Sequence, residues 1–280
     1  MSSGYIRGVA PVSMELDVLP VSAGLFQRIM KEFHLPAATP WLIKSQSTHF
    51  QRYCYGSTTA PLHGMLNSTL IQQYLTMSLG FTMRLATHGV LWMNTLLLVS
   101  YDPAHRLTCA FLHGCNPHQQ EHIINQLKAF GPAAHHPLLL PVILAQMKCK
   151  VIADVKEEVW NTLIWVENGS GQTGVPAISI QYPREPDFVS LTKEALRVVQ
   201  VAGGSKYHAE TLQLILESIR KCLASGPEGL DEGFCEEITE ILVERVDFIE
   251  HTTREVLADL SFIGSHGEAQ LSAMSTREPL

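Results

Sequence analysis

The chain lacks several patterns that identify common classes of protein. Its 280 residues include six cysteines, but none forms a C-x-x-C pair, and the chain is too long for a small disulfide-stabilised scaffold. No G-x-S-x-G occurs, so the nucleophile elbow of serine hydrolases is absent. The first residues contain no basic stretch followed by an apolar core, so we expect no secretory signal. These absences favour reduced thiols in a cytoplasmic protein.

Positive charge and long apolar runs are also scarce. The formal net charge is −7 with His counted as neutral, which argues against a general nucleic-acid partner, because such proteins need a basic face to neutralise phosphates. The longest apolar runs, residues 89–99 and 138–147, are shorter than the ~20 residues that span a bilayer. We therefore expect the sequence given not to cross a membrane.

Helix and strand patterns are abundant. Apolar residues make up 46% of the chain and charged residues 17%, a balance that allows a sizeable core. Apolar residues recur every four positions in residues 21–35 and predict a helix, which the prolines that follow end. Residues 48–56 alternate bulky and polar side chains, as a half-buried strand does. Residues 65–80 predict a helix that stops at Gly80.

The strongest strand signals lie in three segments rich in β-branched and large apolar residues, 81–87, 89–100 and 106–113. Asp102-Pro103-Ala104 separates the last two and predicts a hairpin turn. Asn116-Pro117-His118-Gln119 then predicts a helix start, with Asn as the N-cap, Pro in the first turn and Gln three residues after the cap. We expect an antiparallel sheet followed by a helix.

Residues 168–174 (NGSGQTG) formally match the G-x-G-x-x-G fingerprint of dinucleotide-binding proteins. That fingerprint needs a strand before the glycines and a helix after them. Here an apolar stripe predicts a long helix from Pro141 up to the glycines, and the run that follows them is strand-like. We therefore interpret Asn168-Gly169 as a helix C-cap with Gly169 at positive φ, and not as a nucleotide site.

The last third of the chain predicts helices over residues 187–202, ended by Gly203-Gly204, and over 208–224. From Phe234 onward, apolar residues recur every three or four positions, close to a heptad pattern. This apolar stripe consists of Ile238, Leu242, Val246, Ile249, Thr253, Val256, Leu260 and Ile263. It needs a partner surface, either residues 187–224 of the same chain or a second copy.

These patterns predict an α/β (α+β) fold, with a mostly antiparallel sheet packed with helices and long C-terminal helices that form a stalk or bundle. We expect an irregular arm over residues 1–20, an α/β domain over 21–185 and a helical stalk over 186–265. Residues 266–280 are polar, and we expect this tail to fray.

One segment gathers the residue types that bind zinc. His118 and His122 lie four residues apart on the predicted helix, so both rings can project from one face, and His113 and Cys115 precede them. The spacing matches neither a zinc finger nor an H-E-x-x-H pattern. The favoured interpretation is a strand-to-helix connection with exposed polar residues, with His118 and His122 as weak candidate metal ligands. We identify no catalytic residue.

Two other polar clusters have ordinary structural explanations. His135-His136 precedes the long helix and predicts a loop or N-cap role. Carboxylates gather at the start of the last helix and could hold a divalent cation, but charge that complements the helix dipole on a solvated face is the favoured interpretation. This acidic cluster consists of Glu228, Asp231, Glu232, Glu236, Glu237 and Glu240.

The order of these elements resembles the N-terminal part of fungal proteins of the CorA-like transporter domain family. The block His136-Pro137-Leu138-Leu139-Leu140-Pro141, followed by residues 167–174, carries most of the resemblance, which extends loosely over residues 20–275. It implies an α/β domain that feeds a long stalk helix, and in relatives that helix leads to two transmembrane helices. The Gly-Met-Asn signature of the CorA pore mouth is absent, since Gly64-Met65-Leu66-Asn67 is interrupted and lies in a different part of the chain.

Two functions from different classes follow. The first is a non-enzymatic cytosolic domain of a CorA-like membrane protein, regulatory or cation-sensing, which self-associates through its terminal helices and reaches a membrane only through a segment beyond Leu280. The second is a soluble protein-interaction or adaptor module unrelated to transport. A zinc-dependent enzyme built on His118 and His122 is the least favoured alternative. No cofactor is expected, and a divalent cation is the ligand class that the first function allows.

Overall fold

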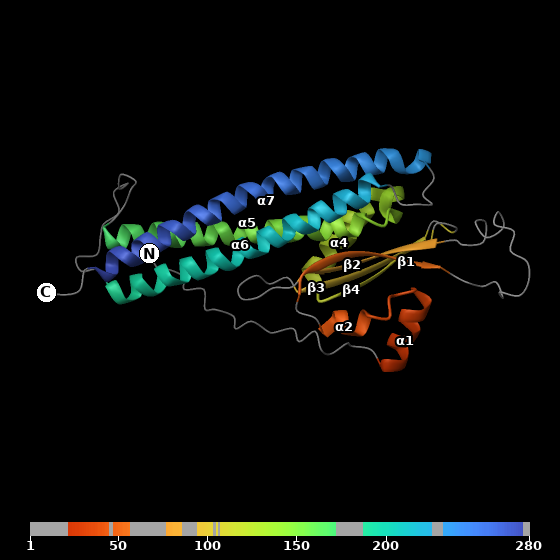
Figure 1. The fold of residues 1–280 in the computed structure, drawn as a ribbon, viewed down its shortest axis with the longest axis horizontal. Helices are drawn as coiled ribbons and strands as arrows, with labels where there is room; N and C mark the ends of the chain where they lie inside the picture. The colour runs from red at the N-terminus through yellow and green to blue at the C-terminus, as the bar shows by residue number, and fades with distance from the viewer. Residues whose placement is uncertain are drawn as a thin grey trace, which may run out of the picture.

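The computed structural model describes most of the chain from Ser22 to Thr276, as residues 22–44, 47–56, 77–85, 94–102, 105, 107–171, 187–225 and 232–276. The predicted arm over residues 1–20 and the strand-like run after the glycines lie outside the described residues. The fold class is the one expected, an antiparallel sheet with helices packed on it and long helices at the C-terminal end (Figure 1).

Four antiparallel strands form the sheet, and they lie side by side in chain order. They are β1 (His49–Gly56), β2 (Met77–Leu85), β3 (Thr95–Asp102) and β4 (Leu107–His113). The predicted hairpin joins β3 to β4, and His105 closes it by donating from Nδ1 to Asp102 Oδ2 at 2.6 Å. The strand predictions over 48–56 and 106–113 are confirmed within a few residues. Of the predictions over 81–87 and 89–100, residues 81–85 and 95–100 are in strands, and residues 86–87 and 89–93 lie outside the described residues.

The two faces of the sheet pack against different helices (Figure 1). On one face, Phe81 and Met83 of β2 join the main core with the long C-terminal helices. On the other face, Leu96 and Leu98 of β3 pack against the short helices that precede the sheet. These are α1 (Ala23–Glu32) and α2 (Thr39–Lys44). Successive side chains of a strand point to opposite faces, so each strand serves both layers.

Residues 77–80, which we predicted as the end of a helix, are the first residues of β2, so that prediction is wrong there, and residues 65–76 lie outside the described residues. Gly80 does not stop a helix. It lies beneath the ring of Tyr53, and a Cβ at Gly80 would come within 2.1 Å of that ring. The Tyr53 hydroxyl crosses β2 and donates to the carbonyl of Val99 at 3.0 Å. The glycine is required by a close cross-strand approach.

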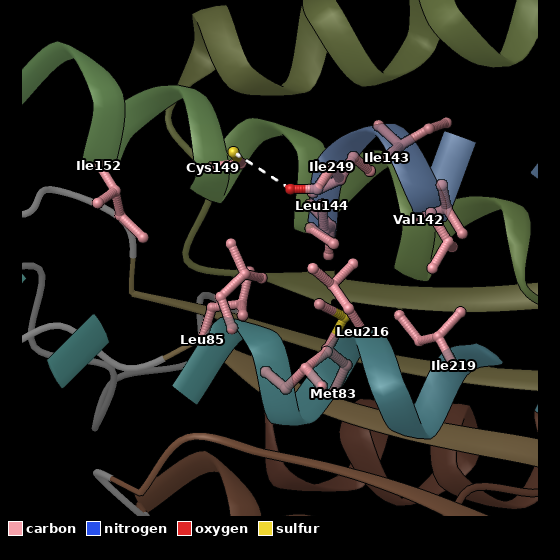
Figure 2. Close-up of a cluster of buried hydrophobic side chains, with 14 of the residues drawn as sticks. Met83, Leu85, Val142, Ile143, Leu144, Cys149, Ile152, Leu216, Ile219 and Ile249 are labelled. Atoms are coloured by element: carbon pink, nitrogen blue, oxygen red, sulfur yellow. Dashed lines mark hydrogen bonds between the residues drawn. The ribbon is translucent and has the colours of Figure 1, made fainter. Parts of the chain in front are cut away.

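Three long helices form a bundle along the sheet and beyond it (Figure 1). They are α5 (Leu139–Ser170), α6 (Phe188–Ala224) and α7 (Glu232–Ser275). We refer to them as the helical bundle. Figure 2 shows its core over the sheet, where Met83 and Leu85 meet Leu144 of α5 and Leu216 of α6. One core therefore joins the sheet to all three helices.

The predicted apolar stripe of the last helix is buried along its whole length, from Ile238 to Ile263. Because α7 packs against α5 and α6, the same chain covers the stripe, which is the first of the two alternatives. At ~25 cal/mol per Å² of apolar surface removed from water, this burial is a main source of the bundle's stability.

Glycine positions account for two wrong helix ends. α6 passes without a break through Gly203-Gly204, because Ala202 and Ser205 on either side are buried against neighbouring helices while the two glycines face open space. Each glycine costs a helix interior about 1 kcal/mol, which packing offsets. The tail after Gly264 is helical to Ser275, so the prediction that it frays is wrong up to that residue, and residues 277–280 lie outside the described residues.

The continuation of α7 has a partner surface. Gly267 lies so close to α6 that a Cβ would come within 2.9 Å of the Val199 side chain. Beyond it, Gln270 and Met274 are buried. A polar sequence therefore stays helical here because its few apolar and small positions face α6 and α5.

Candidate functional site

The segment with zinc-binding residue types forms a capped helix start. Asn116 Oδ1 accepts from the backbone N–H of Gln119 at 2.9 Å, and Gln119 Oε1 accepts from the backbone N–H of Asn116 at 2.9 Å. This reciprocal pair starts α4 (Pro117–Phe130), as the sequence predicted. The residue types of this segment are therefore explained by the hydrogen bonds that cap the start of α4.

The four candidate ligands of this segment have different surroundings. His118 and His122 are exposed on α4, and His113 is half-buried at the end of β4. Cys115 is buried with its Sγ 3.7 Å from Thr95 Oγ1, and burial raises the pKa of its thiol. A metal ligand must be the thiolate, so this environment disfavours metal binding by Cys115. Over the described stretches, no group of three or more His, Cys, Asp and Glu side chains is placed to hold a metal ion.

His136 accepts a backbone hydrogen bond in the turn just before α5. It is buried, and its Nδ1 accepts from the backbone N–H of Leu138 at 3.2 Å. Burial lowers the pKa of His136 to about 4, which keeps the ring neutral and able to accept. The N-cap residue of α5 is Leu138, which has no side-chain cap, so His136 takes the predicted loop role and does not cap the helix. His135 ends a short 3₁₀ turn, η1 (Gly131–His135).

The glycine loop ends α5 two residues later than predicted. Gly171 takes positive φ, at 70°, and its N–H donates to the carbonyl of Asn168 at 3.3 Å. Gly169 stays helical because its missing side chain leaves room for Leu191 of α6, whose Cδ2 would lie 2.6 Å from a Cβ there. A helix precedes these glycines, so the helix-terminus interpretation holds and the order needed for a dinucleotide loop is absent.

The acidic cluster falls partly outside the described residues, which include neither Glu228 nor Asp231. Glu236, Glu237 and Glu240 are exposed on the first turns of α7. These three carboxylates face solvent, which agrees with the solvated-face interpretation.

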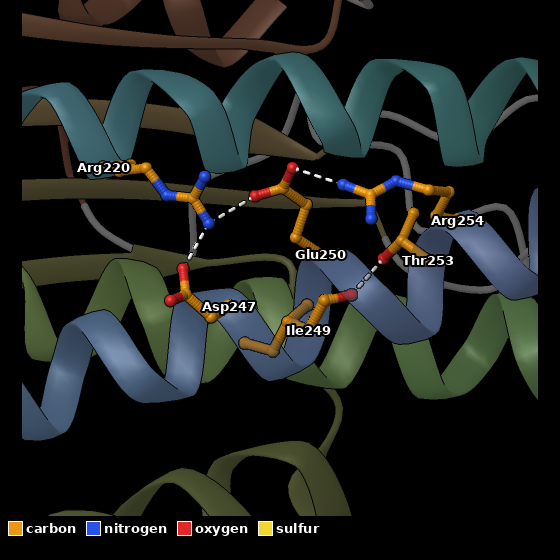
Figure 3. Close-up of polar contacts among 6 residues, drawn as sticks. All are labelled: Arg220, Asp247, Ile249, Glu250, Thr253 and Arg254. Atoms are coloured by element: carbon orange, nitrogen blue, oxygen red, sulfur yellow. Dashed lines mark hydrogen bonds and ion pairs between the residues drawn. The ribbon is translucent and has the colours of Figure 1, made fainter.

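A polar groove of about 430 Å³ lies between α6 and α7. Its centre is an ion-pair network in which the Arg220 guanidinium contacts both Asp247 and Glu250, at 2.5 Å from Glu250 Oε2 (Figure 3). Arg254 Nη2 contacts the other carboxylate oxygen of Glu250 at 2.8 Å. Arg220 lies on α6 and its partners on α7, so the network bridges the two helices.

The chemistry of this groove is electrostatic. The described residues that line it are Glu210, Gln213, Leu214, Glu217, Arg220, Glu250 and Arg254. The Arg220, Asp247 and Arg254 side chains are 43%, 56% and 63% exposed, so water screens the pairs and each contributes about 0–1 kcal/mol. The groove can align two helices or receive a polar partner, and its lining offers carboxylates and guanidinium groups.

Buried polar contacts fasten α7 to its neighbours at two distant levels. Over the sheet, Thr253 Oγ1 donates to the carbonyl of Ile249 within α7 at 2.7 Å. Cys149 Sγ of α5 lies 3.4 Å from Thr253 Oγ1 and 4.0 Å from the same carbonyl (Figure 2). Near the far end, Ser170 Oγ of α5 donates to Gln270 Oε1 at 3.0 Å. The two levels are 17 residues apart on α7, a rise of about 25 Å. Movement of α7 therefore has to disturb both.

Two buried cations were not identified from the sequence. Lys148 is 2% exposed in the bundle, and Arg84 is 1% exposed in the sheet. A signal existed for Lys148, which lies between the buried positions Leu144 and Ile152 of one helix, whereas Arg84 occupies a polar position of an alternating strand. Periodicity alone does not separate such residues from cations that face solvent.

Comparison with known proteins gives no assignment. No family model matches the chain, and no curated protein matches it. Within the stretches that the structure describes, every helix is too short or too polar to be a candidate membrane span.

Proposed function

We propose that this chain is a non-enzymatic regulatory domain of a CorA-like membrane protein, placed on the cytosolic face of a membrane. The observation that supports it most is the single helix of 44 residues, α7, which packs along the bundle and extends well past the sheet (Figure 1). At 1.5 Å per residue this helix is about 66 Å long. A sheet body that feeds a long stalk helix is what the resemblance implies.

In this proposal, the helical bundle transmits movement from the sheet to the far end of α7. Interior packing resists deformation, so a displacement at one end of a packed helix is carried along it. α7 is held over the sheet by Cys149 and near its end by Ser170, and the ion pairs of Arg220 hold it against α6. A signal received by the sheet body thus reaches the far end of α7. A divalent cation is the effector to test first.

Membrane fractionation of the native protein tests the proposal. We expect the polypeptide produced in its own cells, detected with an antibody to the described domain, to sediment with membranes and to resist extraction at alkaline pH. The reading frame that encodes it is expected to continue into two apolar segments of ~20 residues. A polypeptide found only in the supernatant contradicts the proposal.

A protein-interaction module is the second candidate, and one observation favours it. Ile241, Phe248 and Phe262 are 43%, 63% and 48% exposed on α7. They lie seven and fourteen residues apart, so they share one face of the helix, away from the buried stripe. Such a face is suited to a partner helix or to a second copy of this chain.

Analytical ultracentrifugation tests self-association through this face. We expect concentration-dependent dimers that are weakened by Phe248→Ser and unaffected by Glu268→Ala, an exposed control on the same helix that lies outside this face. A monomer at all concentrations removes self-association, and the interaction module would then require a different protein as partner.

A further inference from the structure

The proposed function does not use a cluster of buried polar groups on the sheet. On the face toward α1 and α2, β3 contributes Leu96 and Leu98, whereas β2 contributes Thr82 and Arg84. These two residues alternate with Phe81 and Met83, which belong to the main core on the opposite face. Thr82 is 3% exposed and Arg84 is 1% exposed, so both polar side chains are enclosed.

These side chains do not find partners among the residues that the structure describes. Arg84 Nε, Arg84 Nη1 and Thr82 Oγ1 are buried without a hydrogen bond. The same holds for Nε2 of His49, which is paired directly with Arg84 across β1 and β2. Directly opposite residues of paired strands have Cβ atoms about 5 Å apart, and Thr82 lies two residues from Arg84 on the same face of β2, so the three side chains start from one patch of the sheet.

The electrostatics of the patch call for a negative charge. A guanidinium stays protonated in proteins, and burial without a partner lowers the pKa of Arg84 without neutralising it. An uncompensated buried charge is strongly destabilising, so an enclosed Arg is normally paired with an anion. The described surroundings supply none, and an anionic ligand would complete the patch.

The hydrogen-bonding pattern specifies the kind of anion. Arg84 and Thr82 offer donors. His49 Nδ1 donates to the carbonyl of Ser47 at 3.3 Å, and burial and the charge of Arg84 lower the pKa of His49, so its neutral ring presents Nε2 as an acceptor. An anion that accepts several hydrogen bonds and also donates one matches this set. Hydrogen phosphate has this combination near pH 7, whereas sulfate has no proton to donate.

We propose that Arg84, Thr82 and His49 form a binding site for a hydrogen phosphate ion on the sheet face beneath α1 and α2. Arg84 donates from its planar fork to phosphate oxygens, Thr82 donates from its hydroxyl, and His49 Nε2 accepts from the P–OH group. β1 is the edge strand of the described sheet and its Gln51, opposite Thr82, is exposed, so this edge is the side of the site nearest to solvent.

Equilibrium dialysis with radiolabelled inorganic phosphate in chloride buffer at pH 7 tests the site. We expect one phosphate per chain in the wild type, no measurable binding in Arg84→Met, and binding about tenfold weaker in Thr82→Val, which loses one donor. Arg254→Met removes an exposed guanidinium far along the chain and is the matched control, with binding unchanged. Sulfate is expected to bind at least about tenfold more weakly than phosphate, because it cannot donate to His49.

Several results overturn the proposal. They are the absence of saturable phosphate binding to the wild type, equal binding by Arg84→Met, or equal affinity for sulfate. Circular dichroism shows whether each variant is folded. If Arg84→Met does not fold, Arg84→Lys replaces it, since a lysine keeps the charge but loses the planar fork, and undiminished phosphate affinity in that variant contradicts the assignment.

Discussion

Replacement of Lys148 by Met is expected to stabilise the protein at neutral pH. Lys148 is 2% exposed in α5, and its Nζ has no hydrogen-bond partner among the described residues. Leu144, Ala145 and Ile152, the positions one turn away on the same helix, are buried apolar residues. Methionine has a similar length and no charge, so it removes the desolvated ammonium and keeps the packing.

The magnitude follows from the pKa. Burial lowers the pKa of Lys148 from 10.5 to about 8. At 1.36 kcal/mol for each pH unit, the charged form in the fold costs about 3 kcal/mol relative to the unfolded chain. Because the folded-state pKa is the lower one, the cost is complete below pH 8 and disappears above the unfolded pKa. The contribution of Lys148 to the free energy of unfolding therefore rises between pH 8 and about 10.5.

Urea denaturation followed by circular dichroism between pH 7 and 10.5 measures this effect. Burial raises the pKa of the thiols of Cys115 and Cys149, so those groups reduce stability at high pH and oppose the change due to Lys148. The difference in the free energy of unfolding between Lys148→Met and the wild type removes the contribution of the thiols, because both proteins contain them. We expect a difference of up to about 3 kcal/mol at pH 7 that shrinks toward pH 10.5. A variant less stable than wild type at pH 7, or a difference independent of pH, refutes the reasoning.

Three further changes test the packing and the candidate ligands. Gly169→Val places a side chain against Leu191 and is expected to destabilise by about 1–3 kcal/mol in the same denaturation assay. Gly203→Ala meets open space in a helix interior and is expected to stabilise by about 0.5–1 kcal/mol, so loss of stability there would contradict a continuous α6. His118→Ala together with His122→Ala is expected to leave the melting temperature within a degree or two, because both rings are exposed, and elemental analysis is expected to find no stoichiometric zinc.

Structural features that depend only on residues close in the sequence could be predicted from it. Asn116 and Gln119 form the predicted capping box, because cap chemistry involves only the first helical turn. The stripe from Ile238 to Ile263 is buried as its period required. Which surface would cover it was not predictable, because a stripe of that period suits a neighbouring helix of the same chain as well as a second copy.

Glycine was the least predictable residue, because its effect depends on what lies opposite. Gly80, Gly169 and Gly267 each make room for a side chain of another strand or helix, and none of them ends an element. Gly171 does end a helix, with positive φ. The sequence shows four glycines with similar local context, and only tertiary contacts distinguish a close approach from a helix end.

At the candidate phosphate site, too, the sequence alone does not show whether a charged side chain is exposed or buried. The alternation along β2, with Phe81 and Met83 apolar and Thr82 and Arg84 polar, is the pattern of a strand with one face in water. In the structure the polar face is enclosed as well, since Arg84 is as buried as Phe81. A period of two identifies which residues share a face but not what covers that face. The energetic consequence is large, because an exposed Arg costs nothing and an enclosed one requires an anion. Burial of one guanidinium thus changes Arg84 from a surface residue into the main reason to look for a ligand.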